Sequence, residues 1–418
     1  MKGLRLLKVS LLAMVWALLG NVVLANPITV DDAKQKAQEF FTSNKARRVK
    51  GKQPLTLAYV MKAPSTSVAS GYEDAALYAF NIGDDNGFVI VSGDDVAVPI
   101  LGYSDKGSFD SGNIPTNIKA LLDGYAAQIS WAKSNPAGTS ALRVTPKKIR
   151  TNIDYMLSST WNQNAPFNDQ CIFNGTRCVT GCMATVLAQM TYFWATKGKD
   201  GKTFSCGSKA LDAYTTEKNG YYVSALDALD AFDWANMTDD TPTTTASKAA
   251  VSQLFRYCGQ AIQADFDANG TSGSLGKCVH ALKYNFGYNI GMSMVKEENY
   301  TASEWDDMVY EQLLDGKPVI ISGSGNGSHA FICDGYDASN DTYHINWGWG
   351  GYCDGWFAMT ALNPSYYDYN QNKYAVINIQ PFEESTYALL STDGKTLSFY
   401  HDTKKDTRNG TLYEMNEG

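Results

Sequence analysis

The spacing of apolar residues along the chain predicts three helices. Over residues 183–194 large apolar side chains recur every three or four positions, which is the stripe of a buried helix. Amphipathic helices are also predicted over residues 30–42 and 118–131. The apolar face of the first of these two consists of Ala33, Ala37, Phe40 and Phe41.

Strand patterns accompany the two amino-terminal helices. Residues 76–82 and 87–92 are rich in β-branched and aromatic side chains, and the Gly/Asp/Asn stretch 83–87 between them predicts a hairpin turn. Residues 27–140 lack cysteine and are predicted to form a compact α+β domain. The composition of residues 134–140, Ser-Asn-Pro-Ala-Gly-Thr-Ser, is that of a linker.

Further strands are predicted toward the carboxyl end. A Gly/Ser/Asn loop runs into an apolar strand at residues 329–333, and a second strand at 343–346 precedes a Gly/Trp turn. Residues 387–400 are predicted to form a hairpin with an Asp-Gly turn. The polar end of the chain resembles the opening of repeat modules on some bacterial surface proteins, and no catalytic role is assigned to it.

Cys182 stands where the helix over 183–194 begins. Unpaired backbone N–H groups and the helix dipole stabilise an anion at that end, so the thiol is expected to ionise more easily than a free cysteine, whose pKa is about 8.5. A thiolate is a nucleophile, although a structural cysteine at a helix start is the alternative.

A histidine base is sought among four residues, at positions 280, 329, 344 and 401. His329 is predicted at the edge of a strand, where its imidazole can face a cleft. If the next strand is an antiparallel neighbour, Asn346 lies beside His329, and its amide oxygen can fix the imidazole tautomer. His344 is the rival base, and we interpret it as a packed or hydrogen-bonded structural residue.

Four segments in this order resemble the streptopain family of secreted bacterial cysteine peptidases. They are Trp161–Asn168, Thr180–Thr185, Ser328–Phe331 and Asn346–Gly351, and the resemblance extends over residues 26–380. It implies a papain-like fold, in which a helical half and an antiparallel β-sheet half follow a small α+β prodomain that acts as an intramolecular inhibitor.

The resemblance also implies roles for seven side chains. Cys182 would be the nucleophile and His329 the base. Gln163 would donate to the oxyanion, whereas the sequence alone favours a surface glutamine there. Asn346 and Trp347 would orient and shield the histidine, and Trp347 also fits a core position. The substrate cleft would be lined by Ser274 and Ser328; the family often has glycine before the histidine, so Ser328 is expected to narrow the cleft.

Composition narrows the function. A chain of 418 residues is expected to form two or three domains, and with 44% hydrophobic residues these can bury sizeable cores. The net charge of −8 and the pI near 5.1 argue against a nucleic-acid partner. The expected partners are protein and peptide substrates and the chain's own prodomain.

The first residues have the pattern of an export signal. Lys2, Arg5 and Lys8 precede an apolar run at residues 11–19, and small residues end at Ala25, after which cleavage is expected. The run is shorter than the roughly 20 residues of a membrane span, so no stable span is predicted. A protein that is secreted or associated with the bacterial surface is expected.

All eight cysteines lie between residues 171 and 353. With Cys182 free, seven remain, so at least one cannot pair within the chain. Cys171 with Cys178 is one plausible disulfide. Zinc is disfavoured because Cys178 and Cys182 lack a downstream Cys/His pair at finger-like spacing and the chain has no HExxH motif. Neither a metal nor an organic cofactor is implied.

The sequence therefore predicts a secreted cysteine endopeptidase made as a self-processing zymogen. Its parts are a signal peptide (1–25), an inhibitory prodomain (26–147), a papain-like peptidase domain (148–380) and a carboxyl-terminal extension (381–418). Two alternatives remain at this point. One is a Cys-His-Asn acyltransferase or amidase, and the other is a catalytically silent surface adhesin on a peptidase scaffold.

Overall fold

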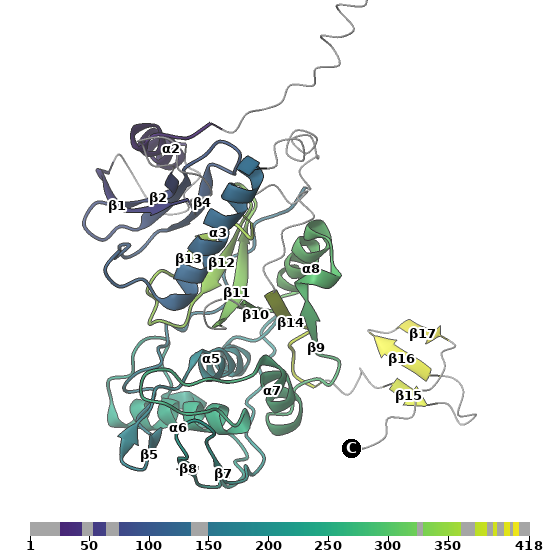
Figure 1. Cartoon of the computed structure of the whole chain (residues 1–418). Coiled ribbons are helices and arrows are strands. Elements are labelled where there is room, and N and C mark those ends of the chain that lie inside the picture. Colours follow the sequence, from purple (N-terminus) through teal and green to yellow (C-terminus); the bar gives the residue numbers. More distant parts are fainter. Residues whose placement is uncertain are drawn as a thin grey trace, which may run out of the picture.

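The computed structural model describes residues 26–43, 53–63, 75–134, 149–323, 329–360 and 373–382, and the backbone of three strands between residues 388 and 408. Within these residues a sheet-rich region lies against a helix-rich region (Figure 1). A separate small sheet is formed by β15 (Ala388–Leu390), β16 (Leu397–His401) and β17 (Lys404–Arg408). The pairing of β15 with β16 confirms the hairpin predicted over residues 387–400.

The amino-terminal region is the α+β unit that the sequence predicts. It contains α2 (Val30–Thr42), β1 (Leu55–Lys62), β2 (Ala75–Ile82), β3 (Phe88–Ser92), β4 (Ile100–Ser104) and α3 (Thr116–Ser134). The four residues expected on the apolar face of α2 are all buried. Alternate residues of β2 face opposite sides of the sheet. Tyr78 and Phe80 join the core that contains α2, whereas Leu77 and Ala79 join the core that contains α3.

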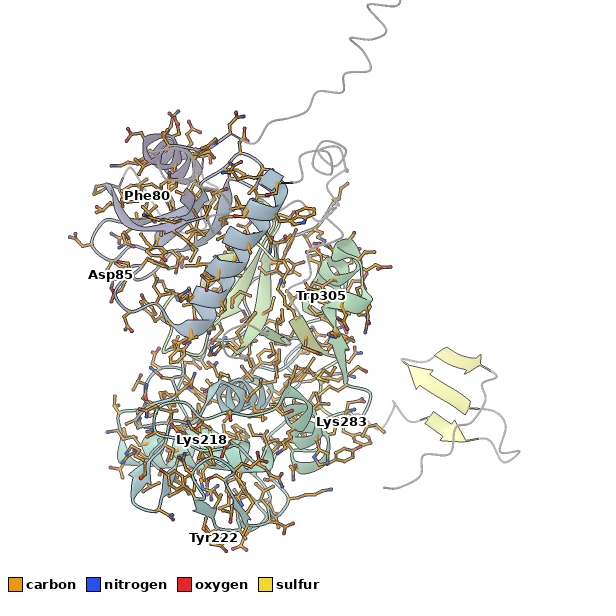
Figure 2. The ribbon with its side chains drawn as sticks, viewed as in Figure 1. Phe80, Asp85, Lys218, Tyr222, Lys283 and Trp305 are labelled. Atoms are coloured by element: carbon orange, nitrogen blue, oxygen red, sulfur yellow. The ribbon has the colours of Figure 1, made fainter. Side chains whose placement is uncertain are left out.

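The helix-rich region follows. It contains β5 (Ile172–Phe173), β6 (Thr176–Arg177), α5 (Cys182–Thr196), β7 (Tyr214–Thr215), β8 (Tyr222–Val223), α6 (Thr245–Ala261) and α7 (Leu275–His280). Every residue of α5 from Met183 to Trp194 is buried, so this helix is the centre of the packing. At the outer end of the region Tyr222 is 62% exposed, in contrast to Trp305 of the sheet region at 2% (Figure 2).

The carboxyl-terminal part of the described chain supplies the remaining strands. These are β9 (Ser293–Lys296), β10 (Val319–Gly323), β11 (His329–Asp337), β12 (Thr342–Asn346), β13 (Gly355–Phe357) and β14 (Lys373–Ile377), with α8 (Ala302–Leu314) beside them. The sheet has ten strands in the order β1-β2-β3-β4-β13-β12-β11-β10-β14-β9. At its middle, β4 pairs antiparallel with β13, with Tyr103 opposite Trp356.

The junction of β4 and β13 unites the amino-terminal unit with the carboxyl-terminal strands in a single sheet. The Tyr103 hydroxyl donates to Asp337 over 2.9 Å, and the Ser104 hydroxyl donates to the Asp354 carbonyl over 2.7 Å. The first of these bonds is buried and the second is partly buried, and hydrogen bonds shielded from water are expensive to break. The amino-terminal unit is therefore held firmly against the rest of the described chain.

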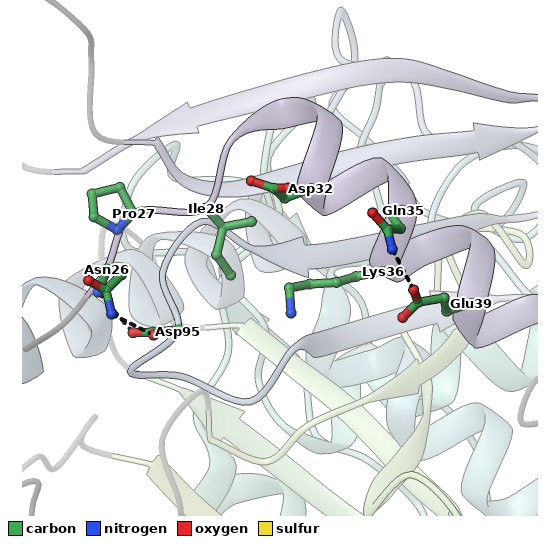
Figure 3. Close-up of a pocket in the computed structure, with 8 residues that line it drawn as sticks. All are labelled: Asn26, Pro27, Ile28, Asp32, Gln35, Lys36, Glu39 and Asp95. Atoms are coloured by element: carbon green, nitrogen blue, oxygen red, sulfur yellow. Dashed lines mark hydrogen bonds between the residues drawn. The ribbon is translucent and has the colours of Figure 1, made fainter. Parts of the chain in front are cut away.

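A surface cavity of about 310 Å³ lies beside α2 (Figure 3). It is lined by Asn26, Pro27, Ile28, Asp32, Gln35, Lys36, Glu39 and Asp95. Within it the Asn26 side chain donates to Asp95 over 2.9 Å, and Gln35 donates to Glu39 over 2.8 Å. The lining contains neither cysteine nor histidine, so the candidate nucleophile and base must be sought elsewhere.

Candidate active site

Gly181 positions Cys182 at the first residue of α5. Its φ of +83° lies in the region that favours glycine, and a Cβ at this position would be 2.7 Å from the Thr271 carbonyl oxygen. The Gly181 carbonyl in turn accepts from both the amide and the hydroxyl of Thr185, over 3.1 Å and 3.0 Å. A glycine is thus required immediately before the cysteine, and the cysteine falls at the helix start, as predicted.

The Cys182 thiol lies at the contact between α5 and β11. The backbone amide of Ala330, the residue after His329, is close enough to the thiol to oppose the rise in its pKa, and α5 packs against β11. This contact places the cysteine of the helix-rich region next to the histidine-bearing end of β11. The two residues, far apart in the sequence, are brought to one junction.

Burial dominates the electrostatics of this junction. It raises the pKa of the Cys182 thiol, an effect that the Ala330 and Met183 amides only partly oppose. It also lowers the pKa of His329. The prediction of an easily ionised thiol is therefore wrong for this form of the chain, because loss of solvation outweighs the helix start. Both shifts favour the neutral thiol and the neutral imidazole.

The Nε2 atom of His329 is buried and has no hydrogen-bond partner within the described residues. The antiparallel pairing of β11 with β12 is confirmed, but it places Asn346 opposite Ile332 and not opposite His329. The Asn346 Oδ1 atom accepts from Gln189 over 2.9 Å and from the Gly348 amide over 3.1 Å. In this form the amide oxygen expected to orient the histidine is occupied by these two donors.

Gln189, on α5 two turns after Cys182, is a site residue that could not be selected from the sequence. Its Oε1 accepts from Ser159 over 3.0 Å and from the Asn346 amide over 3.3 Å. The same side chain therefore links the cysteine-bearing helix to β12 and to the segment before Gln163. It is a polar residue within the predicted helix, outside the apolar stripe that the sequence shows.

His344, the rival base, is a structural residue, as the sequence interpretation has it. Its Nδ1 atom lies 2.6 Å from an oxygen of Asp334, and its ring stacks on Tyr155 with centroids 4.5 Å apart. Asp334 also accepts from the Leu157 amide over 2.8 Å. These contacts hold the chain that enters the helix-rich region and leave His344 engaged with its own carboxylate.

Gln163 is buried, in contrast to the surface position that the sequence alone favoured. Its carbonyl accepts from the amide of Thr180 over 3.1 Å, two residues before Cys182. The amide of Gln163 donates to Asn162 over 2.6 Å. The backbone of Gln163 is therefore fixed beside the segment that carries the cysteine.

Ser274 is exposed and is the residue before α7. A Cβ on the preceding Gly273 would lie 3.1 Å from the Cβ of Met183, so this loop passes closely over the start of α5. Ser328 falls outside the described residues. Of the two residues expected to line the cleft, the structure therefore places one beside the cysteine-bearing helix.

Trp347 is 1% exposed, and its ring packs against Phe331 and Phe357 with centroids 4.8 and 5.4 Å away. Its amide donates over 2.8 Å to Asp354. Burial raises the pKa of Asp354 to about 7, against the opposing effects of this amide and of His344. Trp347 is thus a core residue that directly follows Asn346.

Asn117, a buried residue of α3, connects the amino-terminal unit to the turn that contains Trp347 and Trp349, here called the tryptophan turn. Its Nδ2 donates to the Trp347 carbonyl over 3.3 Å, and its Oδ1 accepts from the Trp349 indole over 2.9 Å. No pattern in the sequence pointed to Asn117, because an asparagine at a helix start is typical of a capping residue.

All eight cysteines are free thiols, so the disulfide considered between Cys171 and Cys178 is not formed. These two residues stand opposite each other at the open end of the β5–β6 hairpin, where the Cys178 amide donates to the Cys171 carbonyl over 2.8 Å. Within the described residues there is no cluster of three or more His, Cys, Asp or Glu side chains suited to a metal ion. In the same part of the chain no helix combines the length and apolarity needed to cross a bilayer.

Two family models match the chain. Residues 161–357 match the peptidase C10 family, and residues 25–129 match the Spi protease inhibitor family. Streptopain of Streptococcus pyogenes is 31% identical over 408 residues, which cover 91% of this chain and 98% of that protein. The thiol protease/hemagglutinin PrtT of Porphyromonas gingivalis is 27% identical over 385 residues, covering 85% of this chain and 42% of PrtT.

A solved structure has the same fold. A fragment of prointerpain A of Prevotella intermedia, in which one cysteine is replaced by alanine, superposes with a TM-score of 0.61 at 26% identity, covering 78% of this chain and 99% of the fragment. Fold and comparisons together define a papain-like cysteine peptidase preceded by an inhibitor-like domain. The chain belongs to the peptidase C10 family, the family of streptopain.

Proposed function

We propose that this chain is the zymogen of a secreted cysteine endopeptidase that processes itself. Cys182 attacks the scissile carbonyl, and His329 carries the proton from the thiol to the leaving amine. The observation that supports this most directly is the packing of α5 against β11, because it brings Cys182 beside the histidine-bearing end of β11, where the Ala330 amide acts on the pKa of the thiol.

The other side chains of the site support the reaction. Gln163, fixed beside Thr180, donates to the oxygen that gains charge in the tetrahedral intermediate. Asn346 and Trp347 hold the turn behind the histidine, and Ser274 with Ser328 lines the cleft. In the active form the pair becomes thiolate and imidazolium, which requires better solvation than the buried junction of the precursor provides.

The proposed division of the chain is a signal peptide over 1–25, a prodomain over 26–147, the peptidase over 148–380 and an extension over 381–418. The prodomain inhibits by its attachment through the shared sheet and by the hydrogen bonds of Asn117 to the tryptophan turn. Removal of the signal peptide during export releases the zymogen outside the cell, and peptide bonds of other proteins are its substrates.

Labelling of the nucleophile tests this proposal. Purified protein that has processed itself is incubated with the epoxide inhibitor E-64, and the modified peptide is identified by mass mapping. A single adduct on Cys182 and loss of peptidase activity in proportion to labelling are expected, because only an ionised, accessible thiol opens the epoxide. An adduct on any of the seven other cysteines, with Cys182 unmodified, would contradict the assignment.

The contacts of Asn117 lead to a separate prediction. Asn117→Ala removes two hydrogen bonds to the tryptophan turn, each with a net contribution of about 0.5–1.5 kcal/mol, so the precursor should convert about 5- to 150-fold faster. Conversion is followed on gels against time. The matched control is Asn113→Ala, a change at an exposed residue just before α3, which should convert at the wild-type rate. Equal rates for all three chains would count against inhibition through Asn117.

A further inference from the structure

Arg150 is enclosed at the point where the described peptidase chain begins. Its side chain is 6% exposed, whereas its neighbour Ile149 is 102% exposed. Two adjacent residues therefore lie in opposite environments, and the buried one is the charged one. A buried guanidinium is costly unless opposite charges and hydrogen-bond acceptors surround it.

Two carboxylates of α8 provide the opposite charge. Nη1 of Arg150 lies 2.6 Å from Asp306, and Nη2 lies 2.6 Å from Asp307. Nη1 also donates to the Tyr343 hydroxyl over 3.2 Å, and that hydroxyl donates to Asp306 over 2.7 Å. Each Nη atom of the guanidinium thus faces its own carboxylate, an arrangement that the single ammonium group of a lysine could not reproduce.

Aromatic rings complete the enclosure. The guanidinium carbon is 4.5 Å from the centroid of the Tyr310 ring and 5.4 Å from that of Tyr336, distances at which a cation is attracted to the ring face. The Tyr310 hydroxyl accepts from the amide of Thr151 over 3.1 Å. We call the enclosing side chains the Arg150 cage; they are Asp306, Asp307, Tyr310, Tyr336 and Tyr343.

The chain after Arg150 remains attached to the sheet. Ile153 exchanges two backbone hydrogen bonds of 2.8 Å with Tyr336, and the Met156 amide donates to the Asp334 carbonyl over 3.1 Å. A peptidase must draw several residues around the scissile bond into its cleft as extended backbone. Cleavage of either bond that flanks Arg150 would therefore require the guanidinium to leave its partners. Asp306 and Asp307 would then lose the cation that they share.

We propose that the Arg150 cage fixes the amino-terminal boundary of the mature peptidase. Processing takes place before Arg150, and the mature chain keeps this residue in its cage. The inference rests on the proposed self-processing and narrows its position: of the predicted region of residues 145–151, only the bonds up to Lys148–Ile149, which precede both bonds that flank Arg150, remain as cleavage sites.

Trypsin provides a test that does not depend on self-processing. It cleaves after lysine and arginine by drawing that side chain into a carboxylate-bearing pocket. The segment offers it Lys147 and Lys148, which precede the described residues, and Arg150 within the cage. In the full-length Cys182→Ala chain under native conditions, we expect cleavage after the lysines and at least about 10-fold slower cleavage of the Arg150–Thr151 bond.

Variants of the cage should remove this protection. Asp306→Asn with Asp307→Asn should make the Arg150–Thr151 bond about as sensitive as the lysine bonds. Asp307→Asn alone, at a partly exposed position, should give an intermediate rate in a chain that still folds. Glu311→Gln, an exposed acid on the same helix that is not part of the cage, is the control and should preserve protection.

Mass spectrometry of the fragments and a thermal melt of each variant decide the result. Equal cleavage after Lys148 and Arg150 in the parent chain would overturn the proposal, as would full protection in a folded Asp306→Asn, Asp307→Asn chain. The wild-type chain is then allowed to convert alone. A mature form that begins at Arg150 or later would also overturn the boundary, whereas tryptic protection without any self-conversion would contradict only the proposed zymogen function.

Discussion

Cys182→Ala in the full-length chain is expected to abolish peptide hydrolysis and self-processing. The methyl group cannot attack a carbonyl, and loss of a nucleophile of this kind typically lowers turnover by about 10⁴-fold or more. The precursor should accumulate at full length. Its conversion is followed by gel and intact mass, and hydrolysis is followed with a fluorogenic peptide.

A second cysteine variant separates chemistry from folding. Cys206→Ala also removes one thiol from the helix-rich region, where Cys206 is 2% exposed and forms part of the core. We expect it to lower thermal stability while the folded fraction keeps its activity. Self-conversion of the Cys182→Ala chain at the wild-type rate would show that another group is the nucleophile.

The local elements of the site could be predicted because short-range patterns determine them. The apolar stripe over residues 183–194 specified a helix, and the structure starts that helix at Cys182. The strand patterns likewise predicted β11 and β12, and the antiparallel pairing that the sequence allowed is present. Their register, in which Ile332 pairs with Asn346, could not be predicted, because a shift by two residues keeps the same side chains on each face of the sheet.

Residues whose role depends on distant contacts could not be found from the pattern. In the sequence Gln189 is only one residue of a buried helix. Its hydrogen bond to Asn346 is seen only in the folded chain. In the sequence Asn117 has the position of a capping residue. Its hydrogen bond to Trp347, 230 positions later, is seen only in the folded chain. Gln163 was selected only through the family resemblance, since burial beside Thr180 is a property of the folded chain.

The predicted direction of the Cys182 pKa shift was wrong for a different reason. The position of Cys182 at a helix start was predicted correctly, and the usual effect of such a position on a thiol is a lowered pKa. In the precursor, however, desolvation is the larger effect and raises the pKa. The rule for helix starts gives the direction of one contribution to the thiol pKa. Only the packed structure shows that desolvation is the larger contribution. A neutral thiol is a poor nucleophile, which is consistent with a precursor that is stored without self-digestion.

His329→Ala is expected to lower turnover nearly as far as Cys182→Ala, by about 10⁴-fold, because the thiol loses its proton acceptor and the leaving amine its proton donor. Asn346→Ala should retain more activity. An amide can orient the histidine but cannot transfer its proton, and orientation is the smaller contribution to turnover.

His344→Ala is the matched histidine control for this prediction. It breaks the buried contact with Asp334 and the stack on Tyr155, so it should lower the melting temperature. Activity per folded molecule should change little, because His344 is engaged with its own carboxylate. Turnover is measured together with the pH profile of kcat/KM, in which loss of the base removes one limb and mere destabilisation does not. An inactive but folded His344→Ala protein beside an active His329→Ala protein would reverse the assignment of the two histidines.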